Sequence, residues 1–107
     1  MEILYKEYKE KDNKDFKVQL YYNLGGTNYY SGREEKRGYY IGVTPVHLED
    51  NGHYIIETSV AWTGIKDCIL EVKRKSSKAE KQAMDLMTDE FIDSYINHVI
   101  RMNKKVA

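Results

Sequence analysis

The spacing of apolar residues changes once along this chain of 107 residues, near Gly64. Before Gly64, apolar and polar side chains alternate, as over Phe16–Tyr22, and a period of two is typical of half-buried strands. From Ile65 to Met102, apolar residues recur every three or four positions, which is the stripe of an amphipathic helix. This single change predicts one α+β domain over residues 1–107, β-rich over 1–62 and helical over 63–107.

The β-rich part contains four predicted strands, namely Glu2–Tyr8, Phe16–Tyr22, Arg37–Val46 and His53–Trp62. The charged run Lys9–Asp15 is too polar to be buried and is predicted to be a turn. Asn51-Gly52 favours a tight hairpin, because both residues tolerate positive φ. We therefore expect an antiparallel four-stranded sheet with one or two C-terminal helices packed on one face, and with its other face available.

The helical part has one clear start and one ambiguous segment. Ser77-Lys78-Ala79-Glu80 fits a capping box, which predicts a helix from Ser77 to about Asn103. Residues 65–75 fit either a short helix capped by Thr63 or a fifth strand centred on Cys68–Lys73. We favour the helix for this segment, and the strand stays open as the alternative.

Composition excludes several classes of protein. Lys and Arg total 17, as do Asp and Glu, so the formal net charge is zero, which argues against a protein that coats DNA non-specifically. A single cysteine, Cys68, allows no intramolecular disulfide. The first residues contain no apolar run typical of a signal peptide or a membrane span, so we expect a cytoplasmic protein with no membrane partner.

Three Tyr-Tyr pairs lie between Tyr21 and Tyr40, interleaved with glycines and paired charges. Tyrosine combines a flat apolar ring with a hydroxyl, and tyrosine and arginine are enriched at binding surfaces. The predicted ligand-binding residues are Tyr29, Tyr30, Arg33, Arg37, Tyr40 and Trp62. Alternation along a strand requires some tyrosines to face the core, so a purely structural segment is the alternative. We favour a non-enzymatic protein that binds a partner protein or a nucleotide-like ligand.

A second hypothesis uses the same surface to bind single-stranded nucleic acid. Aromatic rings beside cations are how such strands are held. The basic cluster Lys73-Arg74-Lys75 would add phosphate contacts, although Glu34 and Glu35 dilute the positive charge. The alternative for this cluster is an ordinary solvated junction.

A third hypothesis is a Mg²⁺-dependent nuclease. Ile69-Leu70-Glu71-Val72-Lys73 resembles the half-motif of the PD-(D/E)xK nuclease superfamily. The resemblance implies that Glu71 and a second acid hold Mg²⁺ while Lys73 positions water. Candidate second acids are Asp50, Glu57 and Asp67. The motif requires residues 68–73 to be a strand. With three histidines and no zinc-spaced pair, we expect no metal, no cofactor and no catalytic residue.

Several phrases together are similar to a family of small uncharacterised proteins from phages and mobile elements of low-GC bacteria. They are Gly25-Gly26-x-Asn28-Tyr29-Tyr30-Ser31, Lys36-Arg37-Gly38-Tyr39-Tyr40, Val43-Thr44-Pro45-Val46 and Leu70-Glu71-Val72-Lys73-Arg74. The similarity covers about residues 20 to 90. It implies a genomic context in which accessory proteins often bind host or defence machinery. That family has no assigned activity, so the resemblance assigns no functional residue.

Overall fold

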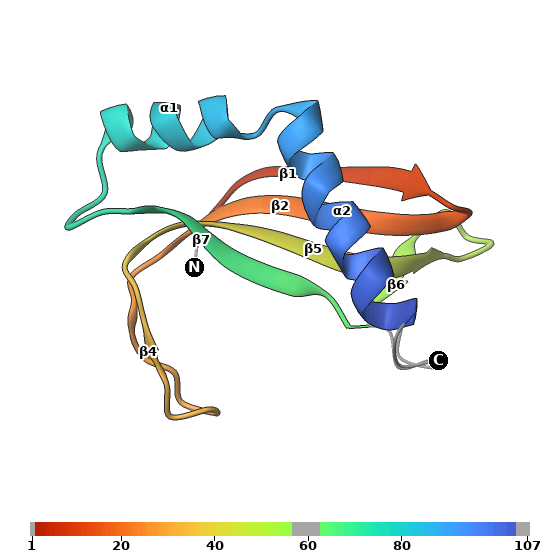
Figure 1. Ribbon diagram of the computed structural model, residues 1–107, viewed down its shortest axis with the longest axis horizontal. Helices are drawn as coiled ribbons and strands as arrows, with labels where there is room; N and C mark the ends of the chain where they lie inside the picture. The colour runs from red at the N-terminus through yellow and green to blue at the C-terminus, as the bar shows by residue number, and fades with distance from the viewer. Residues whose placement is uncertain (1, 57–62, 105–107) are drawn as a thin grey trace.

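The computed structural model describes residues 2–56 and 63–104. Strands and helices follow one another in the order β1 (Glu2–Lys11), β2 (Lys14–Asn23), β3 (Gly26–Thr27), β4 (Glu34–Glu35), β5 (Gly38–Leu48), β6 (Tyr54–Ile56), β7 (Ile65–Glu71), α1 (Ser77–Leu86) and α2 (Asp89–Lys104). Figure 1 shows both helices on one side of a twisted sheet.

The main sheet is antiparallel and has the strand order β1-β2-β5-β6, with β7 also paired to β5. β6 pairs with the end of β5 at Val46–Leu48, whereas β7 pairs with its first part at Gly38–Val43. The two strands therefore occupy the fourth position of the sheet one after the other. The predicted α+β fold, with a sheet four strands wide and two C-terminal helices, is confirmed.

The turn between β1 and β2 is shorter than predicted. Only Asp12 and Asn13 lie outside the strands, and their φ angles of 53° and 62° are those of a two-residue hairpin turn. The charged residues on either side continue as strand. The predicted turn at Asn51-Gly52 is confirmed, with Gly52 at φ 85°. Of the predicted fourth strand, β6 accounts for Tyr54–Ile56, and Trp62 lies outside the described residues.

The preference for a helix over residues 65–75 is wrong, because Ile65–Glu71 forms β7. A glycine on the neighbouring strand makes this pairing possible. A Cβ at Gly38 would lie 2.3 Å from the carbonyl oxygen of Leu70, so no other residue allows β5 and β7 to approach so closely here. A register shift between Tyr39 and Tyr40 then lets Ile65, Ile69 and Leu70 all pack against the core.

The predicted single helix from Ser77 is two helices. Ser76, one residue earlier than expected, caps α1, because its Oγ accepts a hydrogen bond from the Ala79 amide at 3.1 Å. Thr88 caps α2 in the same way, since its Oγ1 accepts from the Phe91 amide at 3.2 Å. The helix is interrupted at Met87 and Thr88, between α1 and α2, although apolar residues keep helical spacing across the interruption.

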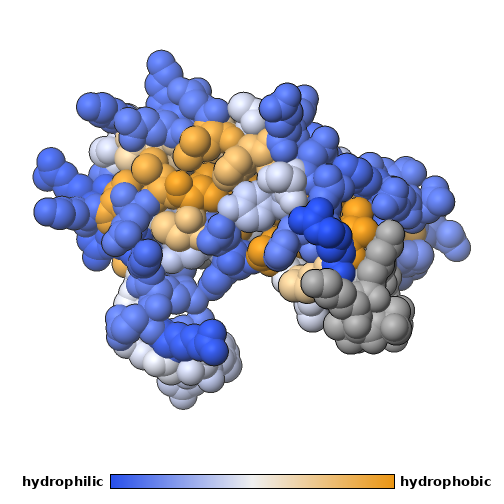
Figure 2. All heavy atoms as spheres, in the orientation of Figure 1, coloured by the Kyte–Doolittle hydropathy of each residue, from blue (hydrophilic) through white to orange (hydrophobic). Residues whose placement is uncertain are grey.

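Two apolar clusters join the helices to one face of the sheet, which we call the helix face. The larger cluster places β2 and β5 under α2 and consists of Phe16, Val18, Ile41, Val43, Ile92, Ile96, Val99 and Ile100. The second lies under α1 and consists of Leu20, Tyr22, Tyr39, Ala79 and Ala83. Figure 2 shows apolar side chains reaching the surface near α1. Among the described helices, none is both long and apolar enough to cross a membrane.

Candidate functional site

The tyrosine-glycine segment forms an arm, which we define as residues 24–37. The arm contains the two-stranded ladder β3–β4, in which Gly26 pairs with Glu35 and Thr27 with Glu34. Figures 1 and 2 show that it projects from the body of the molecule as a separate lobe. The arm therefore presents its tip to solvent at a distance from the core.

Two tyrosines occupy the tip of the arm. The side chains of Tyr29 and Tyr30 are 93% and 94% exposed, and their rings meet edge to face with centroids 5.4 Å apart. Asn28 orders the backbone beneath them. Its side-chain oxygen accepts hydrogen bonds from the Tyr30 and Ser31 amides at 2.9 and 3.0 Å, and its backbone amide donates to the Arg33 carbonyl at 2.7 Å. The rings are thus displayed on an ordered turn rather than on a loose loop.

The base of the arm is held by the carboxylate of Glu35. It accepts hydrogen bonds from the Lys66 ammonium at 2.7 Å, from Asn28 at 2.9 Å and from Asn23 at 2.7 Å. These bonds, with that from Lys66 the strongest, lower the pKa of Glu35 from 4.5 to about 2. Glu35 therefore joins the arm to β2 and β7, and its charge has a structural role.

Arg37, a predicted ligand-binding residue, holds the arm from the other side. Its Nε donates to the Leu24 carbonyl at 3.1 Å, and its Nη1 donates to the Lys73 carbonyl at 2.9 Å. The Val72 amide in turn donates to the Arg37 carbonyl at 3.0 Å. The guanidinium is thus engaged within the chain, whereas Arg33 lies exposed near the tip.

Tyr40, also predicted to bind ligand, lies in the sheet and is 5% exposed. Its ring stacks on Tyr21 across the β2–β5 ladder with centroids 5.6 Å apart and planes 18° apart. Its hydroxyl donates to the Lys36 carbonyl at 2.6 Å, and burial raises its pKa. Tyr22 and Tyr39 form a matching pair, 5.3 Å apart, on the helix face. Two of the three Tyr-Tyr pairs therefore serve the sheet.

The predicted site residues are accordingly not one cluster. Tyr29, Tyr30 and Arg33 gather at the arm tip, Arg37 lies at the base, and Tyr40 is covered in the sheet. Sequence reasoning missed Glu35 and Asn28, which organise the arm. The signal available for Asn28 was its position before a Tyr-Tyr-Ser-Gly turn, where asparagine side chains often accept backbone hydrogen bonds.

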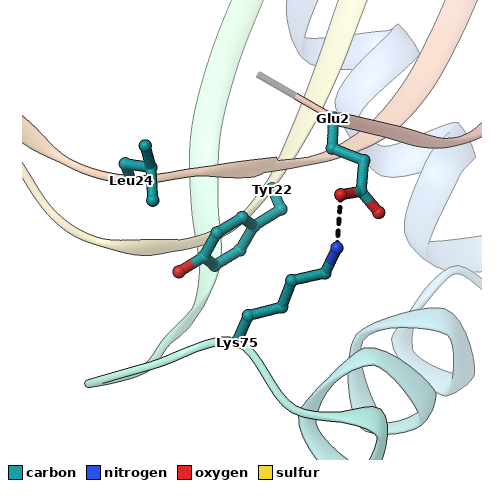
Figure 3. A pocket seen from close by; sticks show the side chains of 4 residues that line it. All are labelled: Glu2, Tyr22, Leu24 and Lys75. Carbon is teal, nitrogen blue, oxygen red and sulfur yellow. Dashed lines mark hydrogen bonds and ion pairs between the residues drawn. The ribbon is translucent and has the colours of Figure 1, made fainter.

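A pocket of about 390 Å³ lies near the arm base and is lined by Glu2, Tyr22, Leu24 and Lys75. Figure 3 shows the Lys75 side chain passing the Tyr22 ring to reach the Glu2 carboxylate, with Leu24 on the opposite wall. The Lys75 ammonium lies 5.9 Å from the centre of the Tyr22 ring. Leu24 is 65% exposed, so the pocket offers an apolar wall open to solvent beside the arm.

The residues of the nuclease hypothesis point to different partners. Glu71 ends β7 and pairs with Lys36 at 3.7 Å, whereas the Asp67 carboxylate accepts a hydrogen bond from Tyr95 of α2 at 2.6 Å. Asp50 follows the far end of β5, and Glu57 lies outside the described residues. Over residues 2–56 and 63–104, no three His, Cys, Asp or Glu side chains are grouped to hold a metal ion. The strand covers Cys68–Glu71 of the motif but ends before Lys73, and the described acids do not converge on it.

Comparisons of this chain with protein-family models, with curated proteins and with solved structures find no match. The geometry of the arm and of the surfaces around it is therefore the basis for the function proposed next.

Proposed function

We propose that this chain is a non-enzymatic binding protein whose arm presents Tyr29 and Tyr30 to a partner protein. The observation that carries the proposal is the exposure of two adjacent tyrosines, 93% and 94%, on a hydrogen-bonded turn. Rings this exposed are removed from water only when a partner covers them, and that burial stabilises a complex. Tyrosine and arginine dominate binding energy at protein interfaces.

Preorganisation of the arm favours recognition of a folded surface. The Glu35 hydrogen bonds and the Arg37 contacts fix the base, so little backbone order remains to be gained on binding. The exposed Arg33, whose carbonyl accepts from the Asn28 amide in the same turn, supplies a cation near the tip, which suits a partner surface with a carboxylate next to an apolar recess. The pocket beside Leu24 adds an apolar wall at the base of the same arm.

The phage or mobile-element origin implied by the resemblance belongs to this proposal and rests on that resemblance alone. In that context the partner would be a host or defence protein.

Capture of partners on the immobilised chain tests the proposal. Tyr29→Ala/Tyr30→Ala removes both rings, whereas Tyr29→Phe/Tyr30→Phe keeps them and serves as the matched control. We expect proteins from a lysate of the source organism to be retained by the wild type and the phenylalanine variant and lost with the alanine variant. Equal retention by all three, measured by quantitative mass spectrometry, would contradict the proposal.

Single-stranded nucleic acid is the second candidate ligand, and one contact favours it. The Arg37–Lys73 hydrogen bond brings the exposed basic segment Lys73–Arg74 next to the arm base, so stacking rings and cations lie at one end of the molecule. Fluorescence anisotropy of labelled single strands at two salt concentrations decides between the candidates. Binding that weakens steeply with salt supports the nucleic acid, because phosphate contacts release counterions.

A further inference from the structure

We propose that two copies of this chain associate through β1, edge to edge and antiparallel, with Tyr8 of each copy on the two-fold axis. β1 ends the strand order of the sheet, and in Figure 1 it forms the upper edge. The opposite side of the sheet carries β6 and β7, so β1 is the long edge in the described part of the chain. This inference does not rest on the function proposed above.

The regular part of β1 determines where the axis lies. A register shift interrupts the β1–β2 ladder between Ile3 and Tyr5, and the two-residue turn begins after Lys11. The uninterrupted segment is therefore Tyr5–Lys11, and its middle residue is Tyr8. A two-fold axis at Tyr8 uses the whole of this segment and no irregular residue.

Charge then selects the same register. In antiparallel pairing about Tyr8, Lys6 of one copy lies opposite Glu10 of the other, and Glu7 lies opposite Lys9. Directly opposed residues share a face, so Lys6 and Glu10 meet on the face away from the helices while Glu7 and Lys9 meet on the helix face. Each of these pairs occurs twice in the dimer and has opposite charges.

Neighbouring symmetric registers are disfavoured. A two-fold axis centred on Lys6, Glu7, Lys9 or Glu10 places two like charges directly against each other, which destabilises strand pairing. Charged residues usually protect an edge strand from pairing. Here they block the other registers and leave one that is complementary.

The state of Glu7 is consistent with this arrangement. Its Oε2 accepts a hydrogen bond from Tyr5, while its Oε1 is covered and has no hydrogen bond within the described residues. The Lys9 ammonium of the same chain lies 3.8 Å from Oε1. In the proposed dimer, Lys9 of the second copy lies directly opposite Glu7.

Lys6 and Glu10 are the best positions for a test, because both side chains are exposed and neither forms an ion pair within residues 2–56 and 63–104. In a homodimer of Lys6→Glu, the introduced glutamate opposes Glu10 at both positions, and in a homodimer of Glu10→Lys, two lysines oppose each other. In a mixed dimer of these two variants, one pair between positions 6 and 10 has both charges reversed and the other is the unchanged pair of Glu10 with Lys6. Sedimentation equilibrium of each variant and of their mixture therefore reports the register as well as the association.

In that mixed dimer, each glutamate of the first variant faces a lysine of the second, so every opposed pair at positions 6 and 10 again has opposite charges. We expect the wild type to dimerise with a dissociation constant on the order of 10 to 100 µM, because a strand-edge contact is small. Each single variant should dimerise roughly ten- to several-hundredfold more weakly. Their equimolar mixture should recover the wild-type constant within about threefold.

The control variant is Glu90→Lys, which makes the same charge change at the exposed start of α2 and leaves both β1 charge pairs intact, so it should dimerise like the wild type. A wild type that stays monomeric at about 500 µM, well above the expected dissociation constant, would overturn the proposal. So would a mixture of Lys6→Glu and Glu10→Lys that associates no better than either variant alone. Circular dichroism of each variant confirms that the charge changes leave the fold intact.

Discussion

The Glu35 carboxylate accepts a hydrogen bond from the Lys66 ammonium at 2.7 Å, which ties the arm to β7. Asn23 and Asn28 donate to the same carboxylate, one from the end of β2 and one from the arm itself. One side chain thus couples the sheet to the turn that carries Tyr29 and Tyr30. The arm's order depends on this charge remaining in place.

Acid should loosen the arm. Because the folded-state pKa of Glu35 is lowered from 4.5 to about 2, its stabilising effect is complete above pH 4.5 and is lost as the pH falls toward 2. We expect the Gly25, Tyr30 and Gly32 amides to lose protection against hydrogen exchange on going from neutral pH to about pH 3. Amides of β2 and β5 should keep theirs.

The matched control for the acid effect is Glu35→Gln, which keeps the side-chain shape and removes the titrating group. Its arm amides should be poorly protected at both pH values. Protection factors of wild-type arm amides that do not change between neutral pH and about pH 3 would show that Glu35 does not hold the arm.

Tyr40 should behave as a core residue. Tyr40→Phe loses the hydrogen bond to the Lys36 carbonyl and should lower the free energy of unfolding by about 1 kcal/mol. Tyr40→Ala also removes the buried ring stacked on Tyr21 and should cost roughly 3 to 5 kcal/mol. Tyr30→Ala, at the exposed tip, should change stability by less than about 0.5 kcal/mol. Urea unfolding of the three variants measures the contrast, and equal losses at positions 30 and 40 would refute it.

The difference between Tyr40 and Tyr30 shows what the sequence can and cannot predict about this site. Both belong to Tyr-Tyr pairs flanked by charge, so residue type marks both as binding residues. Only the pairing of β2 with β5 places Tyr40 opposite Tyr21, and that pairing joins segments distant in the sequence. The location of an exposed aromatic segment was predictable, whereas the division of its rings between core and surface was not.

Gly38 and Gly42 should respond differently to alanine. Both lie in β5, but a Cβ at Gly38 meets the Leu70 carbonyl oxygen at 2.3 Å, whereas one at Gly42 first meets the Tyr21 ring at 3.4 Å. Gly38→Ala should force β5 and β7 apart and destabilise the protein by roughly 1 to 3 kcal/mol or more. Gly42→Ala should stay within about 1 kcal/mol of the wild type. Thermal and urea unfolding measure both, and a harmless Gly38→Ala would contradict the described β5–β7 contact.

Asn103 should contribute to stability from the end of α2. It is 7% exposed, and its side chain donates to the Val99 and Thr63 carbonyls at 2.8 and 3.0 Å and accepts from the Thr63 amide at 2.8 Å. Asn103→Ala removes these partners of Thr63 and should cost about 1 to 3 kcal/mol. Asn97→Ala, on the same helix, is the control and should be neutral or slightly stabilising, because alanine favours helices. Equal effects at the two positions would contradict the assigned role.

The errors in the predicted fold have different physical causes. Residues Ile65–Glu71 fit a helical stripe by spacing alone, and only the close approach to Gly38 decides in favour of the strand. The interruption between α1 and α2 is not visible in the sequence pattern, because apolar residues keep helical spacing across it. The cap at Thr88 is the only local signal of it. Fold class and the first two strands follow from local pattern, whereas β7 depends on a contact distant in sequence and the interruption between the helices depends on a cap that the apolar spacing conceals.

Site-specific photo-crosslinking tests the central claim, that the arm tip binds a partner, most directly. The photoreactive residue p-benzoylphenylalanine replaces Tyr30 in one variant and Leu48, which is 45% exposed at the other end of β5, in the control. In a lysate of the source organism, we predict a discrete cross-linked protein at position 30 and none at position 48. Excess wild type should suppress the adduct, and excess Tyr29→Ala/Tyr30→Ala should not. No adduct at position 30, or the same adducts at both positions, would contradict the claim.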